Sequence, residues 1–254
     1  DTLFTSGTLI GAAMFAILLA GMFLLPLFMQ EMLGFTAMQS GLVLMPRVLV
    51  MFAVTPIVGR LYGRVSARAL VAAGVLFVAY GAYLLSHITL ASSAAVLIHA
   101  VMVQGIGFSL LFVPLTTAAL ANIPRDRLAD ATGLNSLLRQ VGASMGLAVF
   151  ATLLERYGWR ARAVLSSHLL PDRPEVQDRL AQMAAGFVQR GYDPVSAKAA
   201  ALQALAGAAT GQGMVIAFEQ VFLLSGIVLL FTLPLLYFLK VKRDPSHKVH
   251  VEME

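Results

Sequence analysis

Ten strongly polar or ionisable side chains interrupt the long apolar stretches of this 254-residue chain, and they are its candidates for chemistry. An ionised group such as Arg or Asp at the centre of a bilayer costs on the order of 2.5–3.5 kcal/mol on insertion scales, so it needs a partner or a water-filled space. Such groups are candidates for binding a substrate or an ion. They are Gln30, Glu31, Arg47, His99, Gln104, Asn135, Arg139, Gln140, Glu219 and Gln220.

Arg47 and Arg139 are the two cations in this set, and each lies about 10 Å from a predicted helix end at ~1.5 Å per residue. Their side chains can snorkel to the nearby interface. Alternatively, each forms a fixed positive charge that lines a central cavity or pairs with a carboxylate. Glu219 is the candidate partner of Arg47, because both lie near the outer side of the predicted bundle.

The run from Gly142 to Gly146 matches the nucleophile elbow of serine hydrolases, with Ser144 as nucleophile and His99 as a candidate base. The elbow requires a strained strand-to-helix turn, whereas this run lies inside a continuous apolar stretch. Close helix packing already explains the two glycines. The five histidines have no metal-binding spacing and the chain has no cysteine. We therefore predict no metal site, no cofactor and no enzymatic activity.

Six apolar stretches must position these residues, and each is near or above the ~20 residues that cross a bilayer as a helix. Hydrophobic residues make up 59% of the chain and charged residues only 12%, with a mean hydropathy of +0.82. Soluble domains are about a quarter charged. We predict an all-α integral membrane protein, a six-transmembrane-helix bundle with a long helical extracytoplasmic loop before the last helix. The stretches are residues 7–29, 41–62, 69–88, 93–121, 132–156 and 213–239.

The net charge of +5 comes from short basic clusters at helix ends, which argues against nucleic-acid binding because no continuous basic stripe exists. By the positive-inside rule, these clusters lie in the cytoplasm. We therefore expect a multi-pass protein of the inner membrane, surrounded by lipid, with both termini of this segment cytoplasmic. The clusters are Arg60, Arg64 and Arg68; Arg125 and Arg127; and Lys240, Lys242, Arg243 and Lys248.

The predicted organisation has four regions, of which only one is a sizeable loop. They are the first five spans over residues 1–156, a periplasmic loop over 157–212, the last span over 213–240 and a cytoplasmic tail over 241–254.

The loop itself has helical patterns. Apolar residues recur at helical spacing from Val176 to Phe187, which predicts an amphipathic helix. Asp193 is a good N-cap before Pro194 and starts a second helix that we expect to end at Gly207 and Gly211. The loop is either a solvated hairpin that joins two spans or a docking surface for an external partner.

Two stretches resemble known sequence patterns. Residues 59–68 resemble the second copy of the cytoplasmic loop signature of the major facilitator superfamily, with Gly63 in place of the acid and Ser66 in place of the later Gly. Residues 130–146 resemble a more specific run in the fourteen-helix drug:proton antiporters of the EmrB/QacA kind. Supporting matches are residues 25–30, 33–34, 41–47, 104–107 and 114–115.

This resemblance covers essentially the whole chain and implies that it is the C-terminal half of such a transporter. The N-terminal half, which this chain lacks, holds the membrane carboxylates of proton coupling in that family. The resemblance further implies transport of amphipathic drug-like substrates and protons. A periplasmic adaptor and an outer-membrane channel are candidate partners for the long outer loop.

By the same resemblance, the first, second, fourth and fifth spans line the central cavity, while the third and sixth support it. This nominates as cavity or gate residues Gln30, Arg47, Gln104, Asn135, Arg139 and Gln140, with Phe23, Phe28, Phe108 and Phe112 as apolar contacts. The loop signature that would latch the inward gate contributes Gly59, Arg60, Arg64 and Arg68.

The alternative function is a stand-alone six-helix membrane scaffold, or a protein that dimerises through small-residue faces without transport. Small residues four apart, as at Gly7 and Gly11, favour such close helix contacts. The chain begins at Asp1 with neither an initiator methionine nor a signal-peptide pattern, so we expect a fragment or a processed chain.

Overall fold

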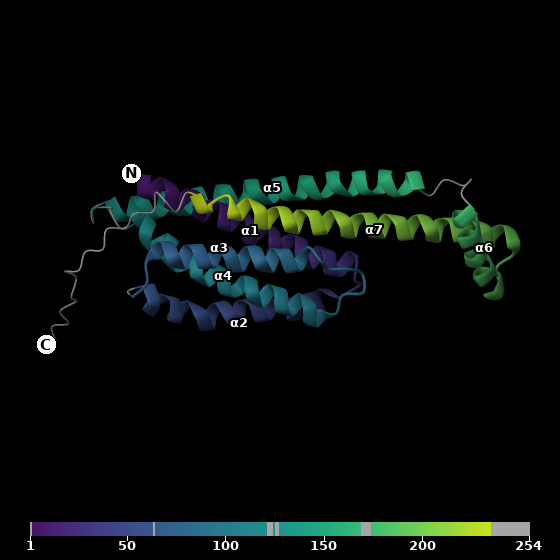
Figure 1. Cartoon of the computed structure of the whole chain (residues 1–254), viewed down its shortest axis with the longest axis horizontal. Helices are drawn as coiled ribbons and strands as arrows, with labels where there is room; N and C mark the ends of the chain where they lie inside the picture. The colour runs from purple at the N-terminus through teal and green to yellow at the C-terminus, as the bar shows by residue number, and fades with distance from the viewer. Residues whose placement is uncertain (1, 63, 121–123, 125–126, 169–173, 235–254) are drawn as a thin grey trace.

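Seven α-helices make up most of the chain in a computed structural model that describes residues 2–62, 64–120, 124, 127–168 and 174–234 (Figure 1). Six of them are long and apolar enough to cross a membrane, and α6 is not among these. The predicted all-helical fold with six spans is confirmed. The helices are α1 (Thr2–Glu31), α2 (Ala37–Tyr62), α3 (Ala67–Leu85), α4 (Ala94–Leu120), α5 (Leu128–His168), α6 (Pro174–Gln189) and α7 (Pro194–Leu230).

Short connections between spans are built from local capping. Gly34 takes a positive φ of 68°, a conformation that glycine adopts without a Cβ penalty. Thr36 and Gln39 then form a reciprocal capping box, in which each side chain accepts a hydrogen bond from the other's backbone N–H, at 2.8 and 3.2 Å. Ser66 caps α3 by accepting from the Ala69 N–H at 3.3 Å. These caps let each chain segment turn back at the membrane surface.

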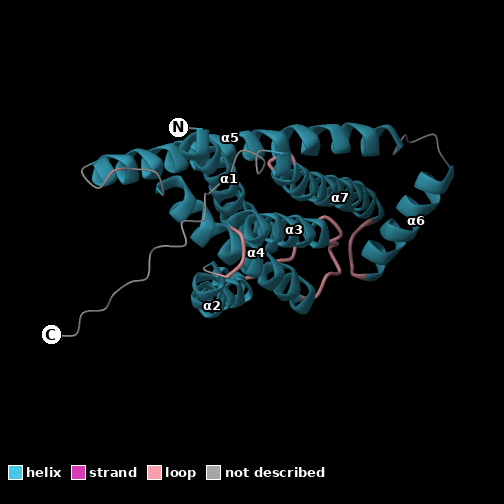
Figure 2. Cartoon of the chain, turned by 60° about the vertical axis from the view of Figure 1, so that its left-hand side comes forward, coloured by secondary structure: helices cyan, strands magenta, loops and turns pink. Residues whose placement is uncertain are grey.

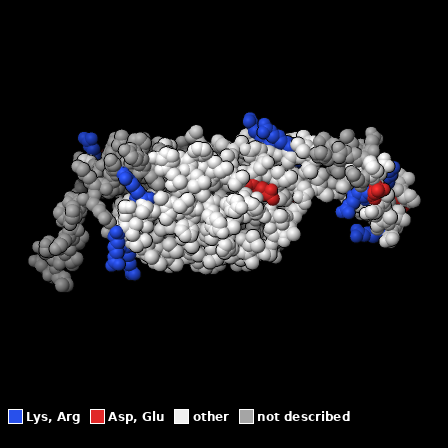
Figure 3. Space-filling model, in the orientation of Figure 1, with Lys and Arg blue, Asp and Glu red and all other residues white. Residues whose placement is uncertain are grey.

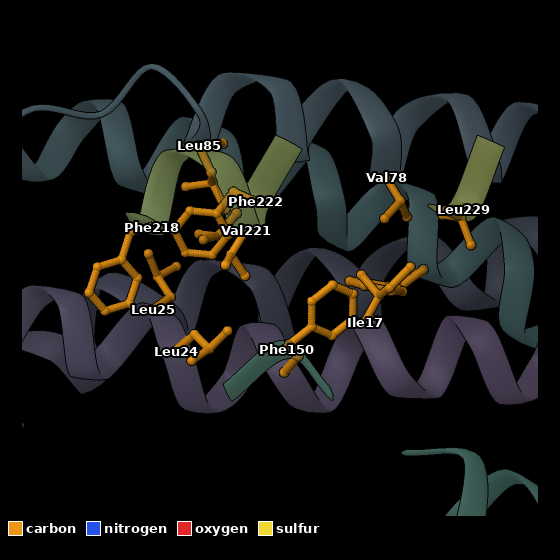
Figure 4. Close-up of a cluster of buried hydrophobic side chains, with 14 of the residues drawn as sticks. Ile17, Leu24, Leu25, Val78, Leu85, Phe150, Phe218, Val221, Phe222 and Leu229 are labelled. Atoms are coloured by element: carbon orange, nitrogen blue, oxygen red, sulfur yellow. The ribbon is translucent and has the colours of Figure 1, made fainter. Parts of the chain in front are cut away.

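Around the bundle, α2 packs on α4, α4 on α3, α3 on α7, α7 on α5 and α5 on α1, while α1 and α4 also contact each other. Figures 1 and 2 place α2 and α7 on opposite sides of the bundle. The apolar core lies between α1, α3, α4, α5 and α7, and Figure 4 shows the part of it that α1, α3, α5 and α7 form. Its labelled members include Leu25, Val78, Phe150 and Phe218, and burial of such side chains excludes water from the bundle interior.

Two spans are far less covered than the other four. In α2 and α5, 17% of the most apolar window is buried, whereas the share is 44–50% in α1, α3, α4 and α7. Figure 3 shows a broad surface of the bundle with few charged side chains; Lys and Arg lie at one end of the bundle, on its upper edge and around the far end of the molecule. The bundle therefore leaves apolar faces of α2 and α5 for lipid or for another membrane-embedded partner.

Helices α5 and α7 extend well beyond the rest of the bundle. They contain 41 and 37 residues, or about 61 and 55 Å at 1.5 Å per residue, against a hydrocarbon thickness of about 30 Å. Figure 1 shows both running past α1–α4 to a far end, where α6 lies across them. We call this extension, residues 157–168 and 174–212, the stalk.

The expected end of the second loop helix at Gly207 and Gly211 is wrong, because α7 runs through both glycines into the last span. Packing on each side of them holds the helix together. Upstream, Ala197 and Ala201 are fully buried where α6 meets α7. Downstream, the backbone of Gly213 comes so close to Arg162 that an added Cβ would lie 3.3 Å from its amide nitrogen.

Helix α7 ends at Leu230 with Phe231 as its C-cap. The remainder of the predicted last span, from residue 235 on, lies outside the described residues. The basic cluster of the tail, Gly63 and Arg125 lie outside the described residues.

Candidate functional site

Arg47 is enclosed in the bundle and paired with Gln104. Its Nη2 donates a 2.8 Å hydrogen bond from α2 to the Gln104 Oε1 on α4. Only 3% of Arg47 and 4% of Gln104 is exposed. Snorkelling to the interface is thus excluded for Arg47, and the guanidinium is held inside the protein by a neutral amide.

Glycines on α3 and α4 make room for this pair. An added Cβ at Gly105 of α4 would lie 2.9 Å from the Arg47 carbonyl oxygen, and one at Gly81 of α3 would clash with the Gln104 side chain. Gly21 of α1 borders the pair, where an added Cβ would lie at an ordinary contact distance of 3.8 Å from the Arg47 Nη1. Residues of four helices therefore surround one hydrogen-bonded pair, and the close approach of α2 and α3 to α4 requires small residues.

The predicted ion pair between Arg47 and Glu219 is wrong. In the part of the chain that the structure describes, no ion pair joins them, and Arg47 bonds Gln104 instead. The reason is the topology, because α2 packs on α4 whereas α7, which carries Glu219, packs on α3 and α5 on the other side. Glu219 is half-buried and lies within electrostatic range of His87, beyond the end of α3.

Arg139 of α5 lies on two aromatic rings that come from α1 and α4. Its Cζ is 4.6 Å from the ring centroid of Phe15 on α1 and 5.7 Å from that of Phe112 on α4. The two rings are 6.2 Å apart. A guanidinium over ring faces gains about 0.5–2 kcal/mol from cation–π attraction. We call Arg139, Phe15 and Phe112 the Arg139 platform.

Helices α1 and α5 approach very closely beneath this platform. Added Cβ atoms at Gly142 and Gly146 would clash with Ala12 and Ala16 of α1. The Thr8 hydroxyl donates a 3.3 Å hydrogen bond to Asn135 Oδ1, which is otherwise buried. Asn135 thus joins two helices inside the bundle.

The nucleophile-elbow pattern has no structural counterpart. Its residues lie inside the continuous helix α5, and the Ser144 hydroxyl donates to the Gln140 carbonyl at 2.9 Å. Gly142 and Gly146 have the packing role described above, and His99 is exposed on α4. Among the described residues, no cluster of His, Asp or Glu could hold a metal ion.

The nominated aromatic residues divide into two groups. Phe23 and Phe112 are 53% and 40% exposed on α1 and α4. Phe28 and Phe108 lie in the core instead, and Phe28 packs edge-on against Phe218 of α7 at 5.2 Å. Phe28 and Phe108 are therefore not cavity contacts, because helix faces could not be assigned from a stretch that is apolar all round.

The remaining nominated polar residues lie at the surface. Gln30 and Gln140 are exposed on α1 and α5. Of the loop signature, Gly59 and Arg60 are exposed in the last turns of α2, and Arg64 is exposed in the connection to α3. Arg68 is half-buried in the first turn of α3.

Sequence reasoning missed Phe15 and Gly21, which border Arg139 and Arg47, and Thr8, which bonds Asn135. Phe15 and Arg139 are 124 positions apart, and the pattern of one sequence has no signal that joins them. The residues four positions before and after Gly21 are Ile17 and Leu25, neither of which is small, so no packing motif marks Gly21.

Comparison with known proteins places these helices in a family. The Major Facilitator Superfamily matches residues 2–147. The multidrug export protein EmrB of Haemophilus influenzae is 30% identical over 252 residues, which are 96% of this chain and 46% of EmrB. The fatty acid resistance protein FarB of Neisseria gonorrhoeae is 25% identical over 240 residues, 94% of this chain and 46% of FarB.

A further relative, the multidrug resistance protein Stp of Mycobacterium tuberculosis, is 35% identical over 142 residues, which are 56% of this chain and 26% of Stp. The chain therefore spans less than half the length of these curated relatives.

Proposed function

This chain belongs to the Major Facilitator Superfamily, whose members are transporters and not enzymes, and from that premise we propose that it is the C-terminal half of a proton-coupled multidrug efflux transporter. Transporters of this family are built from two six-helix halves, and substrate binds near the bilayer midplane between them during alternating access. The exported compounds are amphipathic. The partner in the membrane is an N-terminal half that carries the proton-coupling carboxylates.

The observation that carries this proposal is the poor covering of α2 and α5. These two spans have 17% of their apolar window buried. They carry Arg47 and Arg139, and they pack on α4 and α1. A second six-helix half against them would enclose a cavity next to Arg139. The relatives support a transporter about twice as long as this chain, because 96% of this chain matches only 46% of EmrB.

The side chains available to such a cavity suit amphipathic compounds of varied shape. Exposed methionines occur on α1, α2, α4 and α5, and their flexible thioethers adapt to different ligands. They are Met22, Met38, Met45, Met102 and Met145. The names of EmrB and FarB, a multidrug export protein and a fatty acid resistance protein, also favour export of such compounds.

The stalk supports a further part of the proposal. Orientation by the positive-inside rule puts it in the periplasm, and there it would contact an adaptor that leads to an outer-membrane channel. The face of α6 available to an adaptor is limited, since Val176 is buried and α6 packs on α7.

The first test is the mass of the native polypeptide, detected with an antibody against residues 240–254. A transporter half predicts a species of about twice the 27.1 kDa of this chain or more, if the two halves are one polypeptide. A species near 27.1 kDa would favour the stand-alone scaffold instead, unless a separate six-helix protein copurifies with it.

The second test is transport by the purified native protein in liposomes. An imposed proton gradient should drive accumulation of an amphipathic dye, and collapse of the gradient with an ionophore should stop it. Gradient-independent accumulation would contradict proton coupling, and no accumulation of any dye or drug would contradict export.

A further inference from the structure

Arg139 carries a positive charge that the described protein does not neutralise. Its Nε is buried without a hydrogen-bond partner, and among the described residues no carboxylate pairs with it. A charged group at membrane depth needs a partner or a water-filled space, and among the described residues Arg139 has only the two ring faces. An anion would be a partner for the guanidinium.

The geometry leaves room for that anion. Phe15 and Phe112 lie against the guanidinium, and Arg139 is only half-buried, so its terminal nitrogens remain accessible. A planar guanidinium held by aromatic rings is pre-organised to donate two parallel hydrogen bonds to a carboxylate.

Exposed apolar side chains lie near the platform on α1 and on a neighbouring face of α5. Met22 is seven residues after Phe15 on α1, so the two share a face, and it is 53% exposed. Next to Arg139 on α5, Leu138 and Met145 are likewise seven apart and exposed. A ligand with a carboxylate at the platform can thus lay an alkyl chain along these side chains.

We propose that the Arg139 platform is the head-group site for a single-chain amphiphile that carries a carboxylate. This inference rests on the proposed export function and narrows its substrate class to anionic amphiphiles. A quaternary-ammonium amphiphile of the same chain length is disfavoured, because its head group would meet the unpaired guanidinium.

The test is equilibrium binding of radiolabelled dodecanoate to the purified native protein by scintillation proximity in a neutral detergent, without anionic lipid. Arg139→Gln should weaken dodecanoate binding at least tenfold. Arg139→Lys should weaken it less, because it keeps the charge and loses the planar fork. Arg160→Gln, a charge removal about 31 Å farther along α5 at ~1.5 Å per residue, is the matched control and should leave the affinity unchanged.

Unlabelled dodecyltrimethylammonium should compete poorly with dodecanoate on the wild-type protein, and its relative potency should rise in Arg139→Gln. The inference is overturned if Arg139→Gln binds dodecanoate within twofold of wild type, or if it weakens both probes equally. The first result would assign the guanidinium to a carboxylate of another protein segment. Each variant must match the wild-type elution profile in size-exclusion chromatography. If Arg139→Gln does not, Arg139→Lys replaces it in the binding test.

The experiments distinguish a failure of the proposed binding site from a failure of the proposed export function. Dodecanoate binding that depends on Arg139, in a protein that moves no compound, would support the site and contradict the proposed function. Proton-driven export with no preference between dodecanoate and dodecyltrimethylammonium would support the function and overturn the substrate class.

Discussion

Arg47 and Arg139 occupy nearly the same position along their helices, α2 and α5, yet their surroundings differ. Arg47 is the eleventh residue of α2 and Arg139 the twelfth of α5. The first is enclosed and bonded to an amide from α4, whereas the second lies on two rings with one side open. Arg47 has a structural role because α4 offers it a hydrogen-bond acceptor. Arg139 is available to a ligand because α1 and α4 offer it only aromatic faces.

The family explains the equivalence of position. Each half of these transporters contains two three-helix repeats of inverted topology, here α1–α3 and α4, α5 and α7. The packing of α1 on α5 then corresponds to that of α4 on α2. The repeats have diverged at the contact between the arginine and its neighbour, while the backbone arrangement is retained.

The largest expected effect comes from removing the partner of the enclosed arginine. Gln104→Leu leaves the buried Arg47 guanidinium without its acceptor, and we expect a loss of about 3 kcal/mol in stability. Thermal unfolding in detergent measures it. The double variant Arg47→Met with Gln104→Leu should recover most of the loss, because no unpaired charge remains. Equal stability of Gln104→Leu and wild type would mean that the pair is not structural.

The next largest effect is expected at the contact between α1 and α5, near Arg139. Gly146→Ala places a methyl group against Ala16, and forcing α1 from α5 should cost about 2 kcal/mol. Gly133→Ala in the same helix is the control, because no atom lies within 4 Å of its added Cβ. It should be neutral or slightly stabilising. Similar unfolding temperatures for the two variants would contradict the close contact.

Arg139→Ala should have a smaller effect on stability than either change at the enclosed site. It loses cation–π attraction to two rings, but it also removes an uncompensated charge, so we expect less than about 1 kcal/mol. The amount in the membrane and the unfolding temperature should stay close to wild type. A loss as large as that of Gln104→Leu would remove the distinction between the two arginines.

The smallest effect on stability is expected at Asp193 in the stalk, far from both arginines. Asp193 caps α7 by accepting from the Val195 and Ser196 amides, both at 3.1 Å. Hydrogen bonding with Ser196 holds the pKa of the Asp193 carboxyl below its ordinary value. The stabilisation is therefore present above the ordinary pKa of ~3.9 and is lost as pH falls through the lowered value.

Hydrogen exchange of the Val195 and Ser196 amides measures this cap. Protection in the first turn should fall below about pH 4 in wild type, and Asp193→Ala should lack that pH dependence. Equal pH dependence in both proteins would show that another group is responsible.

Much of the fold could be predicted from the sequence, because transmembrane helices are set by local composition. Apolar length alone located six spans, and Asp193-Pro194 marked the start of α7 correctly. The continuation of α7 through Gly207 and Gly211 was not predictable in this way. Two glycines cost roughly 1 kcal/mol each in helix propensity, and only contacts with α5 and α6 show that packing outweighs this cost.

The candidate site was predictable only as a set of residue types. Arg47, Gln104 and Arg139 were identified because polar groups are costly in lipid. Their partners were not, since every face of these stretches is apolar and no periodicity shows which side turns inward. Glu219 was a candidate partner for Arg47 because both lie at a similar depth in the membrane. The two do not pair, because α2 and α7 do not pack on each other.

The length of the stalk turns small motions of the bundle into large ones. The end of α5 at His168 lies about 39 Å from Gly142, where α5 packs on α1, at 1.5 Å per residue, so a rocking of the bundle by about 10° about that contact would move the far end sideways by about 7 Å. The stalk is thus a lever, and labels on α6 and on the loop between α1 and α2 would report small motions of the bundle.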